Sequence, residues 1–343
     1  MINVYVHCAN KSDATSWYRA WGTFPDIEKR SDIRFHDMTK IFPKLSGKKL
    51  KDHLDNLKKR GIIPKKDEEF LIYDWTESIK ADITYFQRPM DNTILEFAIT
   101  QKLSGSKIWY DLDDNLWEIP GSYDIKKNIG YNELKNIAEF IELSDIITVS
   151  TLELKNYVDS KFGVNCIVIN NEIDFDKYPI NETSTTGLTL WRGSPTHADD
   201  IEKFRDYFES FDEVLFMGYN PITNKPKLKV NGELLPTTDV GLYYNTLKNI
   251  NPSYLLCFLS DNVFNRCKSN ISYLEATLSG AISVNNQVGE FKGKGYDINN
   301  GLQLTLDQVH ELRAEAVADC LENYHLKKLN DIRINLITTY AKL

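Results

Sequence analysis

The segment FNRCKSNISYLEATLSGAISV, residues 264–284, combines the start of a helix, its end and a buried strand. Ser269 or Asn270 can cap the helix, because a small polar side chain accepts hydrogen bonds from the first free N–H groups. Gly280 is suited to end it, since glycine readily adopts the left-handed conformation found after a helix. Free N–H groups and the helix dipole attract anions. The segment therefore predicts a helix–strand unit with an anion site where its helix begins.

Short apolar runs alternate with helical patterns on both sides of this segment. Strands are predicted at 2–8, 33–38, 70–75, 83–88, 107–111, 146–150 and 166–170, and again at 188–191, 214–219, 240–244, 254–259 and 281–285. Helices are predicted at 93–103, 131–143, 152–162, 199–211 and 271–278, with two more in 306–343. Strands that read as continuous apolar runs are typical of parallel sheets covered by helices on both faces. The pattern predicts an α/β protein with doubly wound parallel sheets.

A polar, turn-rich stretch at 178–187 divides the chain of 343 residues into two parts. We expect an N-terminal domain at 1–177, a C-terminal domain at 188–320, and a helix at 321–343 that packs back on the N-terminal domain. In such a pair, ligands bind at the carboxyl ends of the strands, in the crevice between the sheets.

The composition is that of an ordinary globular protein, with 42% hydrophobic and 26% charged residues, which argues against disordered and fibrous classes. A net charge of -8 argues against a protein that coats nucleic acid. Five scattered cysteines without a CxxC pair indicate a reducing compartment. The chain begins without a signal-like segment and has no apolar run of roughly 18 residues, so we expect a cytoplasmic protein without a membrane span.

The sequence of residues 264–284 resembles the donor-binding region of the GT-B glycosyltransferases, especially the GT4-like branch with its FN-x-x-KS…LEA…G pattern. In that fold two Rossmann-like domains face a cleft, and the C-terminal one binds a nucleotide sugar. The resemblance implies that Glu275 binds the ribose, Lys268 and Ser269 the diphosphate, and that Asn265 lies near the sugar. Cys267 stands where the branch usually has a first glutamate, which leaves the donor sugar and the stereochemical course open.

A second segment, LTLWRGSPTHADDIEKF at 188–204, runs from a strand into a helix. Gly193 permits a close approach of the backbone, and Arg192 can hold a phosphate through two hydrogen bonds. The segment resembles the GS-x-x-H-x-x-D opening of the C-terminal domain in the same branch. This implies donor contacts for Ser194 and His197, although a histidine at a helix start is often only an exposed polar residue.

A third segment, KIWYDLDDNLWEIP at 107–120, places Asp111, Asp113 and Asp114 at the end of a strand. Clustered carboxylates can accept a proton, bind a metal or cap the next segment. The YD-x-DD-x-L-W motif resembles the cleft-facing part of the N-terminal domain in GT-B enzymes. These enzymes generally work without a catalytic metal. We therefore expect Asp111 or Asp113 to act as the base, Asp114 to bind the acceptor, and no metal to be held.

The loop after the first strand, CANKSDATSWYRAW at 8–21, opens onto the same crevice but lacks a GxGxxG pattern. Ser16, Tyr18 and Arg19 resemble the S-x-Y-R turn at this place in the family. The resemblance implies that Tyr18 and Arg19 bind the acceptor or a donor phosphate. Simple packing of the aromatic residues is the alternative.

A basic helix is predicted at 46–60, SGKKLKDHLDNLKKR. Residues 44–66 carry nine basic side chains against two aspartates. Such a surface is often only a solvated helix face, but clustered cations also bind phosphate backbones through counterion release. Lys58, Lys59 and Arg60 are therefore candidate contacts to a DNA acceptor, such as a hydroxymethylated base. The frequent Lys, Asn and Ile residues suggest a phage-encoded chain.

Together these segments predict a glycosyltransferase, of hexosyl or pentosyl type, that moves a sugar from a UDP- or GDP-sugar to a hydroxyl acceptor. No further cofactor is expected. A saccharide or lipid-linked acceptor is an alternative to DNA. A non-catalytic protein that binds nucleotide sugars with the same fold is another, and Cys267 is its best support.

Overall fold

The computed structural model describes residues 1–8, 13–38, 47–59, 81–121, 123, 126, 129–236, 238–301 and 303–343. The strand predicted at 70–75, and Arg60, lie outside the described residues, and so does the side chain of Lys58.

The N-terminal part of the described chain forms a six-stranded parallel sheet in the order β2-β1-β3-β4-β5-β6. Its strands are β1 (Ile2–His7), β2 (Ile33–Asp37), β3 (Ile83–Gln87), β4 (Lys107–Leu112), β5 (Ile146–Val149) and β6 (Ile167–Val168). Successive side chains point to opposite faces, as a pleated strand requires. Tyr85 and Trp109 join the cluster on one face, whereas Phe86 and Tyr110 join the cluster on the other.

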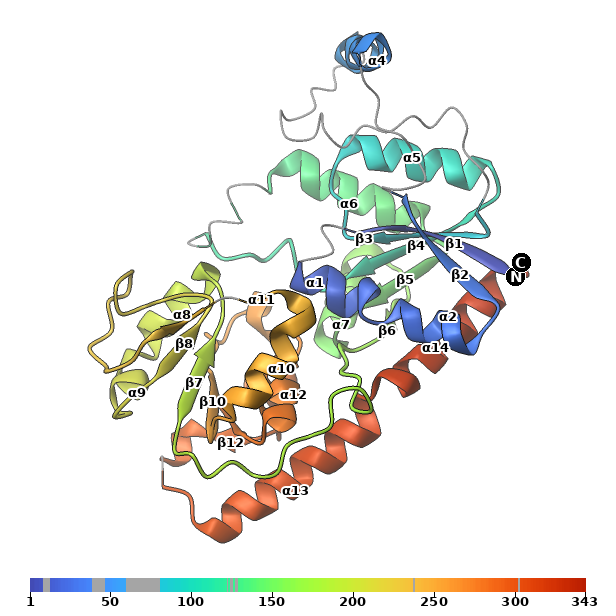
Figure 1. Cartoon of the computed structure of the whole chain (residues 1–343). Coiled ribbons are helices and arrows are strands. Elements are labelled where there is room, and N and C mark those ends of the chain that lie inside the picture. Colours follow the sequence, from blue (N-terminus) through green and yellow to red (C-terminus); the bar gives the residue numbers. More distant parts are fainter. Residues whose placement is uncertain are drawn as a thin grey trace.

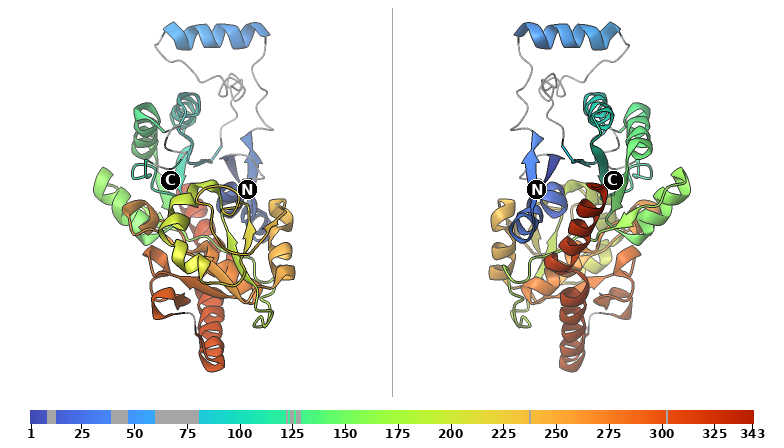
Figure 2. Two further views of the ribbon diagram at one scale, coloured as in Figure 1. Left: turned by 90° about the vertical axis from the view of Figure 1, so that its left-hand side faces the viewer. Right: turned by 90° about the vertical axis from the view of Figure 1, so that its right-hand side faces the viewer.

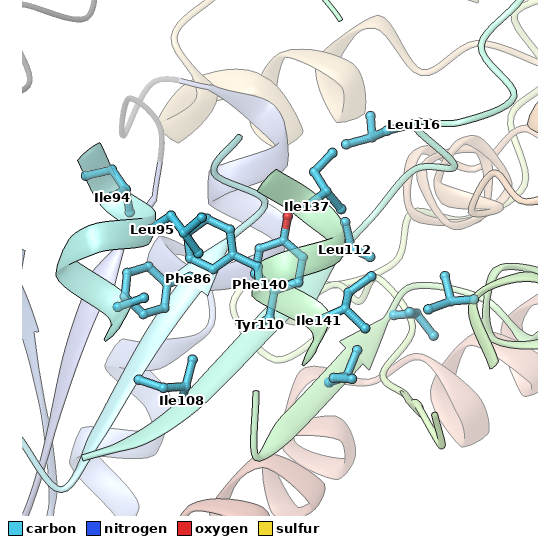
Figure 3. Packing of buried hydrophobic residues seen from close by; sticks show 14 of the residues in the cluster. Phe86, Ile94, Leu95, Ile108, Tyr110, Leu112, Leu116, Ile137, Phe140 and Ile141 are labelled. Atoms are coloured by element: carbon cyan, nitrogen blue, oxygen red, sulfur yellow. The ribbon is translucent and has the colours of Figure 1, made fainter. Parts of the chain in front are cut away.

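Helices cover both faces of this sheet (Figure 1). They are α1 (Ala14–Ser16), the π-helical turn η1 (Trp17–Trp21), α2 (Phe24–Arg30), α5 (Asn92–Leu103), α6 (Tyr131–Leu143) and α7 (Leu152–Phe162), whereas α4 (Gly47–Lys59) lies apart from the sheet. Figure 3 shows how α5 and α6 pack on the sheet, with the ring of Tyr110 stacked on Phe140 at 5.0 Å between centroids. This buried layer holds the end of β4 in place.

The C-terminal part forms a second six-stranded parallel sheet among the described residues, in the order β12-β11-β10-β7-β8-β9. Its strands are β7 (Thr189–Arg192), β8 (Leu215–Met217), β9 (Leu234–Leu235), β10 (Tyr254–Cys257), β11 (Ile282–Asn285) and β12 (Tyr296–Asp297). The helices are α8 (Ala198–Lys203), α9 (Arg205–Glu209), α10 (Val240–Ile250), α11 (Val263–Arg266) and α12 (Ile271–Ser279), with 3-10 turns η4 (Pro195–His197), η5 (Gly289–Phe291) and η6 (Ile298–Asn300). The predicted fold class, two doubly wound parallel sheets, is confirmed.

The chain passes between the two sheets twice. The first passage follows β6, and the second joins α13 (Leu306–Asn323) to α14 (Leu326–Tyr340). The passages are hydrogen-bonded to each other, because Ile173 donates to the Tyr324 carbonyl at 3.2 Å and Leu326 donates to the Ile173 carbonyl at 3.1 Å. Helix α14 then packs on the N-terminal sheet, and both chain ends lie on that side of the molecule (Figure 2). No helix in the described stretches is long and apolar enough to cross a membrane.

The strand predicted at 240–244 is wrong, because these residues begin helix α10. Asp239 caps this helix by accepting a hydrogen bond from Gly241. Tyr244 and Leu247, three residues apart, share its buried side. The aromatic and β-branched composition suggested a strand, whereas the spacing follows a helix. The helix predicted at 199–211 is divided at Phe204, and β9 and β12, with two residues each, are too short to show a pattern.

Candidate functional site

A cavity of about 220 Å³ lies between the two sheets, where their strands end. We call it the charged cavity, because its lining includes Asp113, Asp114, Arg192, His197, Lys268 and Ser269. In the C-terminal sheet it lies next to β7 and β10, the adjacent strands at which the strand order reverses. This is the position at which doubly wound sheets bind ligands.

Polar contacts across the cleft bring the two sets of predicted residues together. Lys268, in the loop before α12, lies 3.5 Å from the carboxylate of Asp114, which follows β4. Ser269 accepts a hydrogen bond of 2.9 Å from the side chain of Asn171. Helix α12 begins beside these residues, with Asn270 at the cap position; its side chain accepts no capping hydrogen bond, and its amide donates to the hydroxyl of Tyr324.

The two cavity aspartates differ in their environments. Asp113 is 10% exposed and lies 3.0 Å from the guanidinium of Arg88, which also lies 3.6 Å from Asp114. Burial raises the pKa of Asp113 to about 6; Arg88 opposes this shift, and the negative charge of Asp114 adds to it. Burial acts in the same direction on Asp114, but Lys268 and Arg88 reverse the effect and hold its pKa below the ordinary value. Asp113 is therefore the better proton acceptor near neutral pH.

Asp111 is not brought to the cavity. Its carboxylate accepts two hydrogen bonds from Arg19, at 2.9 and 2.6 Å, and one from Thr148 at 2.5 Å. The side chains of Arg19 and Asp111 are 1% and 2% exposed. The guanidinium of Arg19 also donates to the Ile169 carbonyl and to the side chain of Asn171. The charge of Asp111 is thus used inside the N-terminal domain, whereas Arg19, its partner, also lines the charged cavity.

A second cavity of about 250 Å³ adjoins the first and shares Tyr18 and Arg192 with it. We call it the aromatic cavity, because Trp17, Tyr18, Tyr243 and Tyr244 line it together with Met217. Burial and the negative charge of Glu275 raise the pKa of Tyr243, so its hydroxyl stays protonated. An aromatic cavity next to a charged one fits a ligand with a flat ring at one end and negative charge at the other.

Glu275 of α12 lines the aromatic cavity and is 1% exposed. Its two carboxylate oxygens accept hydrogen bonds from the hydroxyl of Tyr18 at 2.7 Å and from Nε of Arg192 at 2.5 Å. The buried Nη2 atom of Arg192 has no hydrogen-bond partner among the described residues. Since Arg192 lines both cavities, this nitrogen is a donor available to a ligand.

The other predicted donor residues lie at different depths. Gly193 lines the aromatic cavity, and a Cβ atom there would lie 2.6 Å from the ring of Trp191, so only glycine fits. Ser194 is exposed and pairs with Thr196. Asn265 is fully buried, and Cys267 is 2% exposed and packs with the N-terminal core; neither lines the charged or the aromatic cavity.

Several residues of the site were not predicted from the sequence. Arg88 follows β3 and has an unusual φ of 38°. No sequence motif indicated that this residue belongs to the site. Tyr243 was not predicted as a site residue, because a strand was predicted at 240–244, where helix α10 forms. Asp200 belongs to the GS-x-x-H-x-x-D pattern, but nothing in the pattern indicated that it contacts His197. Within the described ranges, no group of three His, Cys, Asp or Glu side chains is arranged to hold a metal ion.

No protein-family model and no curated protein matches the chain. Among solved structures it is similar to a TarM variant from S. aureus, solved with fondaparinux, alpha-GlcNAc-glycerol and UDP, at 15% identity and a TM-score of 0.54. That match covers 77% of this chain but only 57% of TarM. It is also similar to sucrose-phosphate synthase from Thermosynechococcus elongatus, at 8% identity and a TM-score of 0.54, over 99% of this chain and 96% of that one. The chain therefore has the two-domain α/β fold of the GT-B glycosyltransferases.

Proposed function

We propose that this protein is a glycosyltransferase that moves a sugar from a nucleoside-diphosphate sugar to a hydroxyl acceptor. The observation that carries the proposal is the junction of an aromatic cavity with a charged one at Arg192, which lines both and donates a hydrogen bond to Glu275 in the aromatic cavity. A base, a ribose and a diphosphate follow one another in such a donor in the same order. UDP in the TarM structure supports this class of donor. Membership of the GT4-like branch stays a prediction from the motifs.

In this proposal the base lies in the aromatic cavity and the ribose hydroxyls bind Glu275. Lys268, Ser269 and the unpaired nitrogen of Arg192 bind the diphosphate, since charged donors in a water-poor cavity stabilise phosphate oxygens strongly. The sugar then lies in the charged cavity, on the side of Asp113.

Asp113 accepts the proton of the acceptor hydroxyl in the proposed reaction. The acceptor oxygen bonds to the anomeric carbon while the bond from that carbon to the diphosphate breaks, and the diphosphate leaves with the electron pair. Lys268 and Arg192 stabilise the charge of the leaving group, which can replace a metal. We assign Asp111 and Arg19 to the internal ion pair that holds the end of β4 and not to the reaction.

Titration calorimetry with UDP, GDP and their glucose and N-acetylglucosamine conjugates tests the proposal directly. Binding of at least one nucleotide sugar, followed by slow release of the nucleotide, supports a transferase. Binding without any release, with acceptors present or absent, would support the non-catalytic alternative. Failure of every nucleotide to bind would overturn the donor site itself.

The raised pKa of Asp113 gives the reaction an expected pH dependence. Protonated Asp113 cannot accept a proton, so kcat/KM should fall as the pH drops through about 6 and level off above it. Rates measured from about pH 5 to about pH 8 test this. Asp114→Asn should move the acidic limb to lower pH, because the charge of Asp114 is one cause of the raised value. A flat profile across this range would contradict Asp113 as the base.

We further propose a polyanionic acceptor, such as DNA with hydroxymethylated bases, on the basis of α4. Lys48, Lys49, Lys51 and Lys59 are exposed on this helix, against Asp52 and Asp55. Positive charge clustered on a helix of the domain that would hold the acceptor favours a phosphate backbone. A saccharide or a lipid-linked sugar is the competing acceptor class.

Neutralising α4 should separate these acceptor classes. With a DNA acceptor, Lys51→Gln/Lys59→Gln should raise KM for DNA and make binding less dependent on salt, with a slope smaller by about 0.9 for each phosphate that the variant no longer neutralises. Lys135→Gln/Lys161→Gln, on α6 and α7, removes equal charge elsewhere on the domain and should change neither. Unchanged turnover of DNA in both double variants would remove α4 from the acceptor site.

A further inference from the structure

Asp200, buried in α8, forms a closed set of contacts beside the charged cavity. Its Oδ1 accepts hydrogen bonds from the backbone of Ser260 at 2.8 Å and from the amide of Asn265 at 3.1 Å. Its Oδ2 accepts one from the hydroxyl of Tyr123 at 3.0 Å and lies 3.1 Å from Nδ1 of His197. Asp200 is 1% exposed, so these four contacts take up both of its oxygens without solvent.

The contact with Asp200 determines which nitrogen of His197 carries the hydrogen. An ionised carboxylate only accepts, so Nδ1 of the ring must donate and the neutral ring is left with a lone pair on Nε2. Burial lowers the pKa of His197; Asp200 opposes this, and Lys268 and Arg192 add to it. The ionised carboxylate of Asp114 also lies nearby, with Lys268 beside it, and the net shift of the His197 pKa is still downward. The ring is therefore neutral at pH 7.

The ring of His197 lines the charged cavity, and its side chain is 23% exposed. Nε2 makes no hydrogen bond with the described part of the chain. A lone pair at this position repels phosphate oxygens, which also only accept, and attracts a hydroxyl group. The cations of the cavity have the opposite preference. The lone pair of His197 therefore favours the sugar hydroxyls of a nucleotide sugar, and the cations favour its diphosphate.

We propose that Asp200 is a positioning residue that keeps His197 in its Nδ1–H form, so that Nε2 accepts a hydrogen bond from a hydroxyl group of the donor sugar. This rests on the proposed function, in which the charged cavity holds the sugar. Tyr123 extends the arrangement to the N-terminal domain, since its ring packs with the core of that domain while its hydroxyl contacts Asp200. Residues from both domains therefore contribute to the contacts that fix the histidine.

The first test measures the ring itself and needs no ligand. Imidazole nitrogen shifts in two-bond proton–nitrogen spectra should show the Nδ1–H form for His197, assigned by the loss of its signals in His197→Gln. In D200N the amide oxygen should stay opposite Ser260 and Asn265, which only donate there. The amide NH2 then faces His197 and moves the ring hydrogen to Nε2, while the hydroxyl of Tyr123 can accept instead of donate.

Asp199→Asn provides the matched control, because Asp199 is the exposed neighbour of Asp200 on α8. It should leave the ring in the Nδ1–H form. An Nε2–H form in the unaltered protein, or the same form in the unaltered protein and D200N, would overturn the positioning role.

The second test measures what the lone pair binds. His197→Ala should weaken UDP-glucose, or the sugar conjugate that binds best, by about two- to tenfold in calorimetry, the size of one neutral hydrogen bond. Affinity for the free nucleotide should not change. Equal losses for nucleotide and nucleotide sugar would overturn the sugar contact. Failure of the unaltered protein to bind any nucleotide would instead overturn the proposed function, and the nitrogen spectra would still decide the role of Asp200.

Discussion

Replacing Asp111 with Asn should destabilise the protein by about 3–5 kcal/mol, the usual cost of leaving one member of a buried ion pair without its partner. The guanidinium of Arg19 is 1% exposed and directs two of its hydrogen bonds to this carboxylate. Without the charge of Asp111, the cation stays buried, because its remaining contacts, to Ile169 and Asn171, hold it in place. Urea unfolding of the two proteins measures the difference in the free energy of unfolding.

Asp113→Asn is the matched variant, since the same exchange is made two residues further on. Arg88 keeps its contact with Asp114 and is 22% exposed, so the loss of stability should stay below about 1 kcal/mol. Turnover should fall by roughly 10²–10⁴-fold, the range for a missing general base. The reverse result, with Asp111→Asn stable but inactive and Asp113→Asn fully active, would move the base to Asp111.

The sequence could predict most strands of the sheets because they are continuous apolar runs bounded by turns. Runs such as 107–111 and 146–150 match β4 and β5 almost residue for residue. Prediction failed where composition and spacing disagreed, as in α10, whose valine and tyrosines favour a strand while their positions follow a helix. It also failed for β9 and β12, since two residues show no period.

The site could be predicted at the level of segments but not of individual contacts. The segments 8–21, 107–120, 188–204 and 264–284 each contribute residues to one of the two cavities, because the ends of parallel strands meet at one edge of a sheet, whereas the described part of the basic segment at 46–60 contributes none. Which aspartate faces the cavity depends on side-chain alternation and on Arg19, a partner 92 residues away in the sequence. The role of Asp200 depends on contacts from two domains. Spacing along the chain carries no information about such pairings.

Glu275→Gln should weaken binding of UDP or GDP, whichever the protein binds, by about 10- to 100-fold. A hydrogen bond to a charged group contributes about 1.5–3 kcal/mol, and the amide keeps the shape of the side chain while losing the charge that two ribose hydroxyls would share. The variant also leaves Arg192 buried without its anion, so its melting temperature must be measured alongside. Glu311→Gln, an exposed exchange on α13, should leave both affinity and stability unchanged.

Comparing nucleotides of different length separates the ribose contact from the phosphate contacts. Glu275→Gln should weaken the monophosphate and the diphosphate by the same factor, because both contain the ribose. Lys268→Ala should weaken the diphosphate more than the monophosphate, since the lysine lies in the charged cavity and not in the aromatic one. Unchanged affinity of both nucleotides in Glu275→Gln would remove this residue from the donor site. A loss in Glu275→Gln that grows with phosphate number would instead mean that Glu275 acts through Arg192, by fixing the guanidinium that meets the diphosphate.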